Sequence, residues 1–325
     1  MARDFRVMLA LVVLGLFLPA GASGEDAAAP IQKLHVEAHA DFDYDFNATQ
    51  QPDAKPAKLL VPRRGSMTFT QYAKGEYNFN PEGRFDVQAK YELFQNFHSR
   101  RLLAYIDTMT HTWTLRPSYS FLEGKNLVLW VPFSFNFTDV GSDKNTTAFS
   151  LTPNCFHRLS ETLGYSVEMR LVRNYGWTPQ VFPQFYDSTS RAIGSSAGFF
   201  YFIGDKGGYL QLRLNYDYVG ARGSNNDTSS YNLTMSGEYP VTTKLKFYCY
   251  LTMGLLPYEH PYRDGTEFVF HKRHDKTLLV GSTVTYDIYK GLSANLHYNV
   301  RRQDSNIGIY DYVTHIIGVQ LAYAY

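Results

Sequence analysis

The sequence predicts an all-β protein, an antiparallel up-and-down β-barrel of about fourteen strands that spans a membrane. Three observations support this fold class. Long segments alternate between apolar and polar residues with a period of two, and the connections between them are alternately short and long. Aromatic residues make up 16% of the chain although its mean hydropathy is negative, at −0.30. This combination is typical of strands that face lipid on one side only.

The first 22 residues have the organisation of a signal peptide. Arg3 and Arg6 precede an apolar run from Val7 to Leu18, and a small-residue cleavage site follows at 20–22. The run is about twelve residues long, too short to anchor the chain comfortably in a bilayer. We therefore expect residues 1–22 to be removed on export, residues 23–33 to form a short lead and residues 34–325 to form the barrel.

The first predicted strand has the clearest alternation. From Leu34 to Phe46 the even positions are apolar or aromatic, and the odd positions are His, Glu or Asp. A tilted strand needs about 9–11 residues to cross a bilayer, whereas strands of soluble proteins are mostly about 5–6 residues long. The length and the period of this segment both predict a membrane-spanning strand.

The alternation recurs along the rest of the chain. Met67 to Phe79 and Phe85 to Leu93 flank an Asn-Pro-Glu-Gly turn, which predicts a hairpin. Strand four then passes through Trp113 to Phe121, and strand five covers Leu129 to Phe137. Strand six is the weakest prediction because Pro153 interrupts it. The remaining strands are expected at 147–157, 162–173, 191–203, 209–220, 230–241, 244–256, 276–287, 292–302 and 309–325.

The last strand ends in alternating apolar and aromatic residues. This ending resembles the closing strand of bacterial outer-membrane β-barrels, although Tyr325 stands where that family usually has Phe. The resemblance implies that the barrel-assembly machinery reads the ending as an insertion signal. The residues concerned are Val319, Leu321, Tyr323 and Tyr325.

The preceding hairpin also has a family likeness. Arg301-Arg302-Gln303-Asp304-Ser305-Asn306 and Tyr310-Asp311-Tyr312 look like the last hairpin of porin-like barrels and of the barrel domains of surface-lipoprotein assembly modifiers. Assembly modifiers carry a helical repeat domain before the barrel, and here strand one begins too close to the signal peptide to leave room for one.

The connections predict how the barrel lies in the membrane. Short ones are expected at 80–83, 122–126, 158–161, 204–208, 242–243 and 288–291, and longer ones at 47–64, 98–106, 139–146, 174–190, 221–229 and 257–275, with 303–308 a short exception. Outer-membrane barrels have short periplasmic turns and longer extracellular loops. We therefore expect a Gram-negative outer-membrane protein with both termini in the periplasm and with outer-membrane lipids around it.

The polar positions define a candidate lumen. Charges on opposite walls of a water-filled pore set up a transverse field that selects solutes, but they can equally pair with one another and fill the interior. The residues expected to line the lumen are His35, Glu37, His39, Asp41, Asp43, Arg170, Arg213, Asp217, His297, Asn299 and Arg301.

Other site chemistries have little support in the sequence. His35 and His39 would be about 13 Å apart on a strand and could not share a metal ion. No segment resembles the lipase or protease barrels, and we predict no enzyme, metal or cofactor. The net charge of +1 gives no indication of nucleic acid. Cys155 and Cys249 fall on apolar faces of strands that are not neighbours, so we expect unbridged thiols.

The function expected is a channel for small polar solutes. Two alternatives remain open from the sequence. One is a barrel for export or assembly of surface proteins or lipoproteins, and the other is a closed structural or adhesive barrel that acts through its 174–190 and 257–275 loops.

Overall fold

The computed structural model describes residues 33–47, 65–99, 107–122, 126–141, 144–179, 183–204, 207–263 and 268–325. Residues from Lys33 onward form one compact unit. The predicted signal peptide, 1–22, and all but the last residue of the predicted lead, 23–33, lie outside the described residues.

This unit is built almost entirely from β-strands. The first eight are β1 (Leu34–Asp45), β2 (Ser66–Asn78), β3 (Phe85–His98), β4 (Thr108–Ser120), β5 (Leu127–Trp130), β6 (Phe133–Val140), β7 (Lys144–Leu151) and β8 (Asn154–Arg158). The others are β9 (Leu163–Tyr175), β10 (Ser190–Ile203), β11 (Gly208–Ala221), β12 (Thr228–Pro240), β13 (Leu245–Arg263), β14 (Phe268–Tyr289), β15 (Leu292–Ser305) and β16 (Tyr312–Ala324). Among the described residues three single-turn helices lie in connections: α2 (Pro183–Tyr186), η3 (Ser224–Asn226) and η4 (Gly308–Tyr310).

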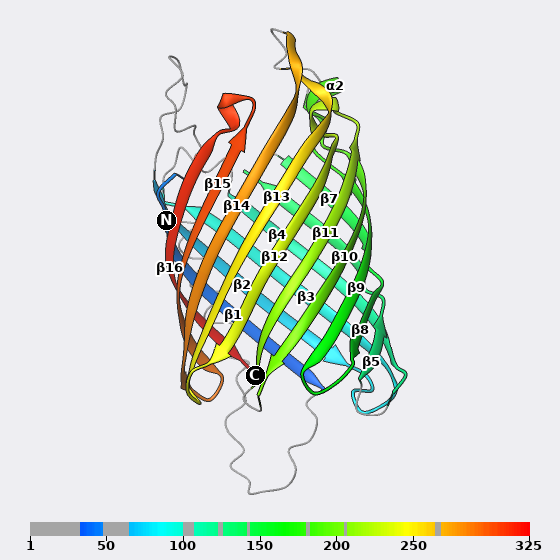
Figure 1. Cartoon of the computed structure of the whole chain (residues 1–325), viewed down its shortest axis with the longest axis vertical. Coiled ribbons are helices and arrows are strands. Elements are labelled where there is room, and N and C mark those ends of the chain that lie inside the picture. Colours follow the sequence, from blue (N-terminus) through cyan, green and yellow to red (C-terminus); the bar gives the residue numbers. More distant parts are fainter. Residues whose placement is uncertain are drawn as a thin grey trace, which may run out of the picture. The chain divides into compact units, whose positions relative to one another are not determined.

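The strands form one closed antiparallel sheet. Most pair with their neighbours in the chain, β5 and β6 both lie between β4 and the β7–β8 segment, and β1 pairs with β16 to complete the ring. β5 and β6 follow one another along a single membrane-spanning strand, as do β7 and β8, so the barrel has 14 strands. The strands tilt around the barrel, and the C-terminus lies at the end of the short turns (Figure 1). The structure confirms the predicted fold class.

Prolines cause the two strand interruptions. Pro153 separates β7 from β8 as the sequence predicts, and Pro132 separates β5 from β6, which the sequence analysis did not foresee. A proline has no N–H to give to the sheet, so the ladder breaks there. Neighbouring amides still bond to the proline carbonyls, Thr152 N to Pro132 O at 3.0 Å and Met169 N to Pro153 O at 2.9 Å. The wall of the barrel therefore stays continuous.

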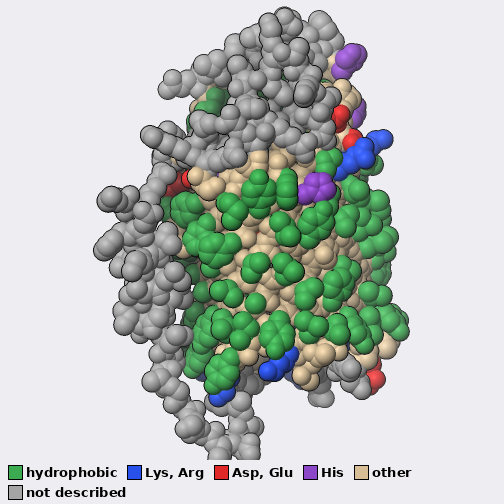
Figure 2. Space-filling model, turned by 90° about the vertical axis from the view of Figure 1, so that its left-hand side faces the viewer, with side chains coloured by type: hydrophobic (Ala, Val, Ile, Leu, Met, Phe, Trp, Pro, Cys, Tyr) green, Lys and Arg blue, Asp and Glu red, His purple; other side chains and the backbone are tan. Residues whose placement is uncertain are grey.

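The barrel carries its apolar side chains on the outside. Phe42, Trp113, Leu214 and Leu321 are among many large hydrophobic residues with about half or nearly half of their surface exposed. Figure 2 shows such side chains spread over a broad band of the visible face, with charged side chains at its edges. In the described part of the chain the buried large hydrophobics are Tyr262 and Tyr312. A wall of this kind is stable when hydrocarbon lies against it.

Two connections are shorter than the sequence predicts. β13 and β14 extend through most of the predicted 257–275 loop and project beyond their neighbours (Figure 1), and β6 and β7 take up most of 139–146. Cys155 and Cys249 are free thiols, on β8 and β13. No helix among the described residues is long and apolar enough to cross a membrane.

Candidate functional site

The inner face of the barrel carries many of its charged side chains. In an antiparallel ladder directly paired residues point to the same side, and Asp43 and His297 are both paired with Gly318 of β16. The same ladders place all the residues expected to line the lumen on the face opposite to the exposed hydrophobic side chains. These are His35, Glu37, His39, Asp41 and Asp43 on β1, Arg170 on β9, Arg213 and Asp217 on β11, and His297, Asn299 and Arg301 on β15.

A network of polar contacts links β1, β2 and β3. The Nζ of Lys74 lies 2.5 Å from Oε2 of Glu37, and His39 contacts the other oxygen of the same carboxylate. Tyr72 donates a hydrogen bond of 2.6 Å to Glu92 on β3. Glu37 and Lys74 keep 25% and 17% of their side-chain surface exposed. This part of the wall is paired, yet water reaches it.

A second group joins the first strand to the end of the chain. The Nε2 of His297 lies 2.8 Å from Oδ1 of Asp43, although 254 positions separate them in sequence. Asp41 is next to this pair on the inner face, and its Oδ1 is buried without a hydrogen-bond partner among the described residues. The β1 wall is therefore rich in carboxylates, with a histidine beside them.

Arginine–carboxylate pairs lie on β9 and β11. The Nη2 of Arg170 is 2.6 Å from Oδ1 of Asp217, and the Nη2 of Arg213 is 3.2 Å from Oε2 of Glu168. Arg170 and Asp217 keep 37% and 24% of their side-chain surface exposed. The sequence analysis named three of these four residues, and Glu168 is the partner it missed. Two further predicted residues make other contacts: Asn299 accepts a hydrogen bond from Tyr250, and Arg301 lies 5.6 Å from the ring centre of Tyr312.

The two histidines of β1 lie next to the carboxylate of Glu37. His39 contacts Glu37, and the Nε2 of His35 is 3.8 Å from the same carboxylate, which Lys74 also holds. Within the described ranges no group of three or more His, Cys, Asp or Glu side chains is arranged to hold a metal ion.

An aromatic cluster, which the sequence analysis missed, surrounds Arg273 at the end of the barrel opposite to the short turns. The guanidinium of Arg273 lies 3.3 Å from the ring centre of Tyr310 and 4.5 Å from that of Tyr258. Both its Nε and Nη2 donate to the carboxylate of Asp275, whose side chain is 1% exposed. Tyr262 packs edge-on against Tyr310, with ring centres 5.4 Å apart.

The same cluster draws its members from separate segments. Tyr262 belongs to β13 and Tyr310 to η4, and Gln303 of β15 donates to Asp275 at 3.1 Å. Burial and the hydrogen bond with Tyr310 raise the pKa of Tyr262 to about 12. The charges of this cluster near neutral pH are thus those of the Arg273–Asp275 pair. An Arg-x-Asp pattern downstream of Tyr258 and Tyr262 was the available sequence signal, but the sequence predicts a long connection at 257–275.

Comparisons with known proteins agree with the β-barrel fold. A family model described as "Protein of unknown function (DUF2860)" matches residues 190–324, less than half of the chain. No curated protein matches the sequence. Among solved structures, the outer membrane channel DcaP of Acinetobacter baumannii is similar at a TM-score of 0.52 and 10% identity, over 90% of this chain and 96% of that chain. The fold is that of an outer-membrane β-barrel channel.

Two other solved structures have weaker similarity. A Pseudomonas aeruginosa FadL homologue has a TM-score of 0.48 at 9% identity, over 90% of both chains. OmpT of Vibrio cholerae has a TM-score of 0.46 at 12% identity, over 90% of this chain and 99% of that chain. At such identities the likeness concerns the fold, so the role of the inner face has to be argued from its own residues.

Proposed function

We propose that the protein is a channel that lets small polar solutes cross the outer membrane of a Gram-negative bacterium. The observation that carries the proposal is that charged side chains on the inner face keep part of their surface accessible to water. Glu37, Arg170 and Asp217 are 24–37% exposed although they point into a closed barrel. Water next to fixed charges inside a barrel is the condition for passage of polar solutes.

The distribution of charge supports a selective rather than an inert interior. The β1 wall carries the carboxylates Glu37, Asp41, Asp43 and Asp45, whereas farther around the ring, on β9 and β11, Arg170 and Arg213 are each paired with a carboxylate. An excess of carboxylates on one wall gives a field across the pore. The Arg273 cluster would then narrow the pathway at one end. The proposal involves no catalysis and no cofactor.

The chain ending supports assembly in the same membrane. Val319, Leu321, Tyr323 and Tyr325 share the outer face of β16, and the backbone of Tyr325 exchanges hydrogen bonds of 2.8 and 2.9 Å with Val36 of β1. An exposed apolar ending is accessible to the assembly machinery until β1 pairs with β16. The partners proposed are therefore outer-membrane lipids and, during biogenesis, that machinery.

Planar-bilayer recording of the purified full-length protein tests the channel. We expect stepwise conductance, and bilayers that stay at background current after incorporation would rule the function out. Two variants test whether the inner charges face the pathway. Arg170→Gln leaves Asp217 unpaired and favours cations, whereas Asp217→Asn leaves Arg170 unpaired and favours anions.

The size of this selectivity change follows from electrostatics. A unit charge about 4 Å from a passing ion changes its energy by roughly 1 kcal/mol in water. The cation-to-anion permeability ratio, obtained from reversal potentials, should therefore change about two- to fivefold in opposite directions for the two variants. Equal reversal potentials in both variants would show that Arg170 and Asp217 do not face the conduction pathway.

A further inference from the structure

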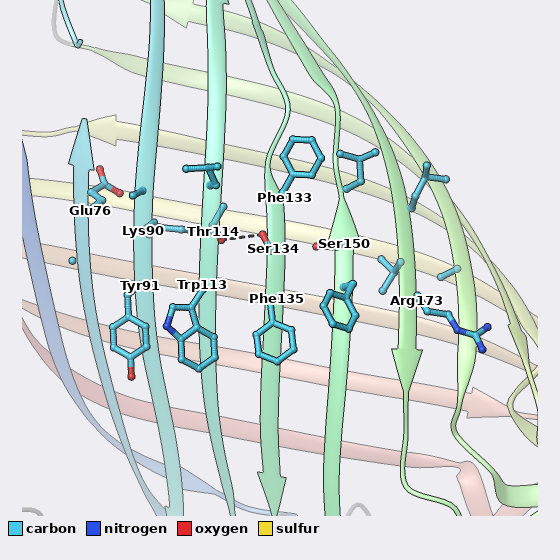
Figure 3. A pocket seen from close by; sticks show the side chains of 18 of the residues that line it. Glu76, Lys90, Tyr91, Trp113, Thr114, Phe133, Ser134, Phe135, Ser150 and Arg173 are labelled. Atoms are coloured by element: carbon cyan, nitrogen blue, oxygen red, sulfur yellow. Dashed lines mark hydrogen bonds between the residues drawn. The ribbon is translucent and has the colours of Figure 1, made fainter. Parts of the chain in front are cut away.

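The outer wall contains an aromatic ladder that ends in two arginines. Residues paired across successive strands form one row, in the order Tyr91, Trp113, Phe135, Phe149, Arg173 and Arg191. The ring centres of the first four are 5.5, 5.5 and 5.0 Å apart. Figure 3 shows Tyr91, Trp113 and Phe135 side by side, with Arg173 farther along the same wall.

A groove runs along this row. Its volume is about 1130 Å3, and a second cross-strand row lines its other side, with Leu115, Phe133 and Ile193 among its members. Trp113, Arg173 and Arg191 also line it. Because every side chain of the two rows faces outward, the groove opens to the surroundings of the barrel and not to its lumen.

The arginines at the end of the groove are unusual for such a wall. Arg173 and Arg191 are directly opposite each other on β9 and β10, where like charges repel, and cationic side chains on a lipid-facing wall are unfavourable. The guanidinium of Arg173 contacts the ring of Tyr175 at 5.1 Å. Across the described ranges neither arginine forms an ion pair with a carboxylate of the chain. An anion from outside the chain would offset the repulsion.

We propose that the groove binds an anionic, phosphate-bearing membrane lipid whose headgroup carries no cation, with an acyl chain against the aromatic ladder and the phosphate between Arg173 and Arg191. The apolar lining suits an acyl chain, and paired guanidinium groups suit phosphate because each can donate two parallel hydrogen bonds. Both arginines lie where β9 ends and β10 begins, at the rim opposite to the short turns. A headgroup is found at such a rim, since phosphate stays at the edge of the hydrocarbon. The site requires an embedded wall but is independent of conduction.

Quenching of Trp113 fluorescence by brominated lipids tests the site. The reporter is the full-length protein carrying Trp130→Phe and Trp177→Phe, in phosphatidylcholine vesicles that contain brominated phosphatidylglycerol, brominated phosphatidylcholine or a brominated fatty acid. We expect the brominated phosphatidylglycerol to bind about tenfold more tightly than brominated phosphatidylcholine, as charge-assisted hydrogen bonds allow. Equal quenching by both phospholipids would overturn the proposal, because the net negative charge of the lipid would then not be recognised. Equal affinity for the fatty acid would also overturn it, because phosphate would then not be recognised.

Variants of the arginines identify the binding residues. Arg173→Gln with Arg191→Gln should abolish the tenfold preference, and each single variant should reduce it. Arg302→Gln is the matched control, since Arg302 also lies on the outer face but 2.8 Å from Asp304. Loss of the preference in the control, or its survival in the double variant, would assign the effect to general surface charge. Free inorganic phosphate has no acyl chain, so adding it should not displace the brominated phosphatidylglycerol or relieve quenching. An unchanged shift of the folded band on heating shows that each variant forms the barrel.

Discussion

At the scale of single residues, the buried Arg273–Asp275 pair is the most sensitive contact. Asp275 is 1% exposed and Arg273 is 11% exposed, so removing one partner leaves an uncompensated charge in a dry environment. Arg273→Gln should therefore lower the free energy of unfolding by about 3–5 kcal/mol. Urea unfolding in detergent, followed by the heat-modifiable gel band, measures it.

Two comparisons separate this charge effect from lost packing. Adding Asp275→Asn to Arg273→Gln removes the orphaned charge and should recover most of the stability. Arg302→Gln breaks an exposed pair, whose partners are 58% and 52% exposed, and should cost no more than about 1 kcal/mol. If the double variant is as unstable as the single one, the loss comes from the stacking on Tyr258 and Tyr310 and not from charge.

At the scale of elements, the turn between β14 and β15 holds the closing strand in place. Gly291 has a positive φ of 78°, and its carbonyl accepts a hydrogen bond of 2.9 Å from Ala324 N. A Cβ at this position would collide with the carbonyl oxygen of Ala324. Gly291→Ala should therefore cost more than the roughly 1–3 kcal/mol of the strained backbone alone, measured as lost unfolding free energy.

Gly204 in the β10–β11 turn provides the matched control. It also has a positive φ, of 57°, but a Cβ there would meet nothing within 4 Å among the residues that the structure describes. Gly204→Ala should show the backbone cost without the collision. Equal losses in the two variants would mean that the contact with Ala324 contributes nothing to closure of the barrel.

The elements also show where prediction from sequence succeeds. Lipid imposes a period of two on every strand, so the alternation from Leu34 to Phe46 is visible in the sequence and β1 appears where it predicts. Outside the hydrocarbon region this period-two constraint no longer applies. The ends of β13 and β14 are held by Arg273 and its tyrosines, contacts between distant segments that leave no periodic signal. Pro132 was missed because the apolar alternation continues on both sides of it.

At the scale of the whole molecule, the sequence predicts which face of the sheet each residue of the candidate site occupies, but not which residue it contacts. Alternation assigns Asp43 and His297 to the inner face, yet their contact depends on β1 pairing with β16. Ring closure and register determine such pairs, and they follow from the complete barrel. The same reasoning explains why Glu168 was missed beside Arg213. The charged lumen and the apolar wall are thus consequences of one closed sheet.

The orientation of the barrel gives the last prediction. If the short turns are periplasmic, the projecting β13–β14 hairpin reaches the cell exterior. In a Cys155→Ser, Cys249→Ser background, His271→Cys on the hairpin should react with a membrane-impermeant maleimide on intact cells. Thr243→Cys, in the turn before β13, should react only after the outer membrane is permeabilised. Both positions are exposed to solvent, so only the membrane accounts for a difference in labelling between them. The reverse labelling pattern would mean that the barrel has the opposite orientation, with its termini outside the cell.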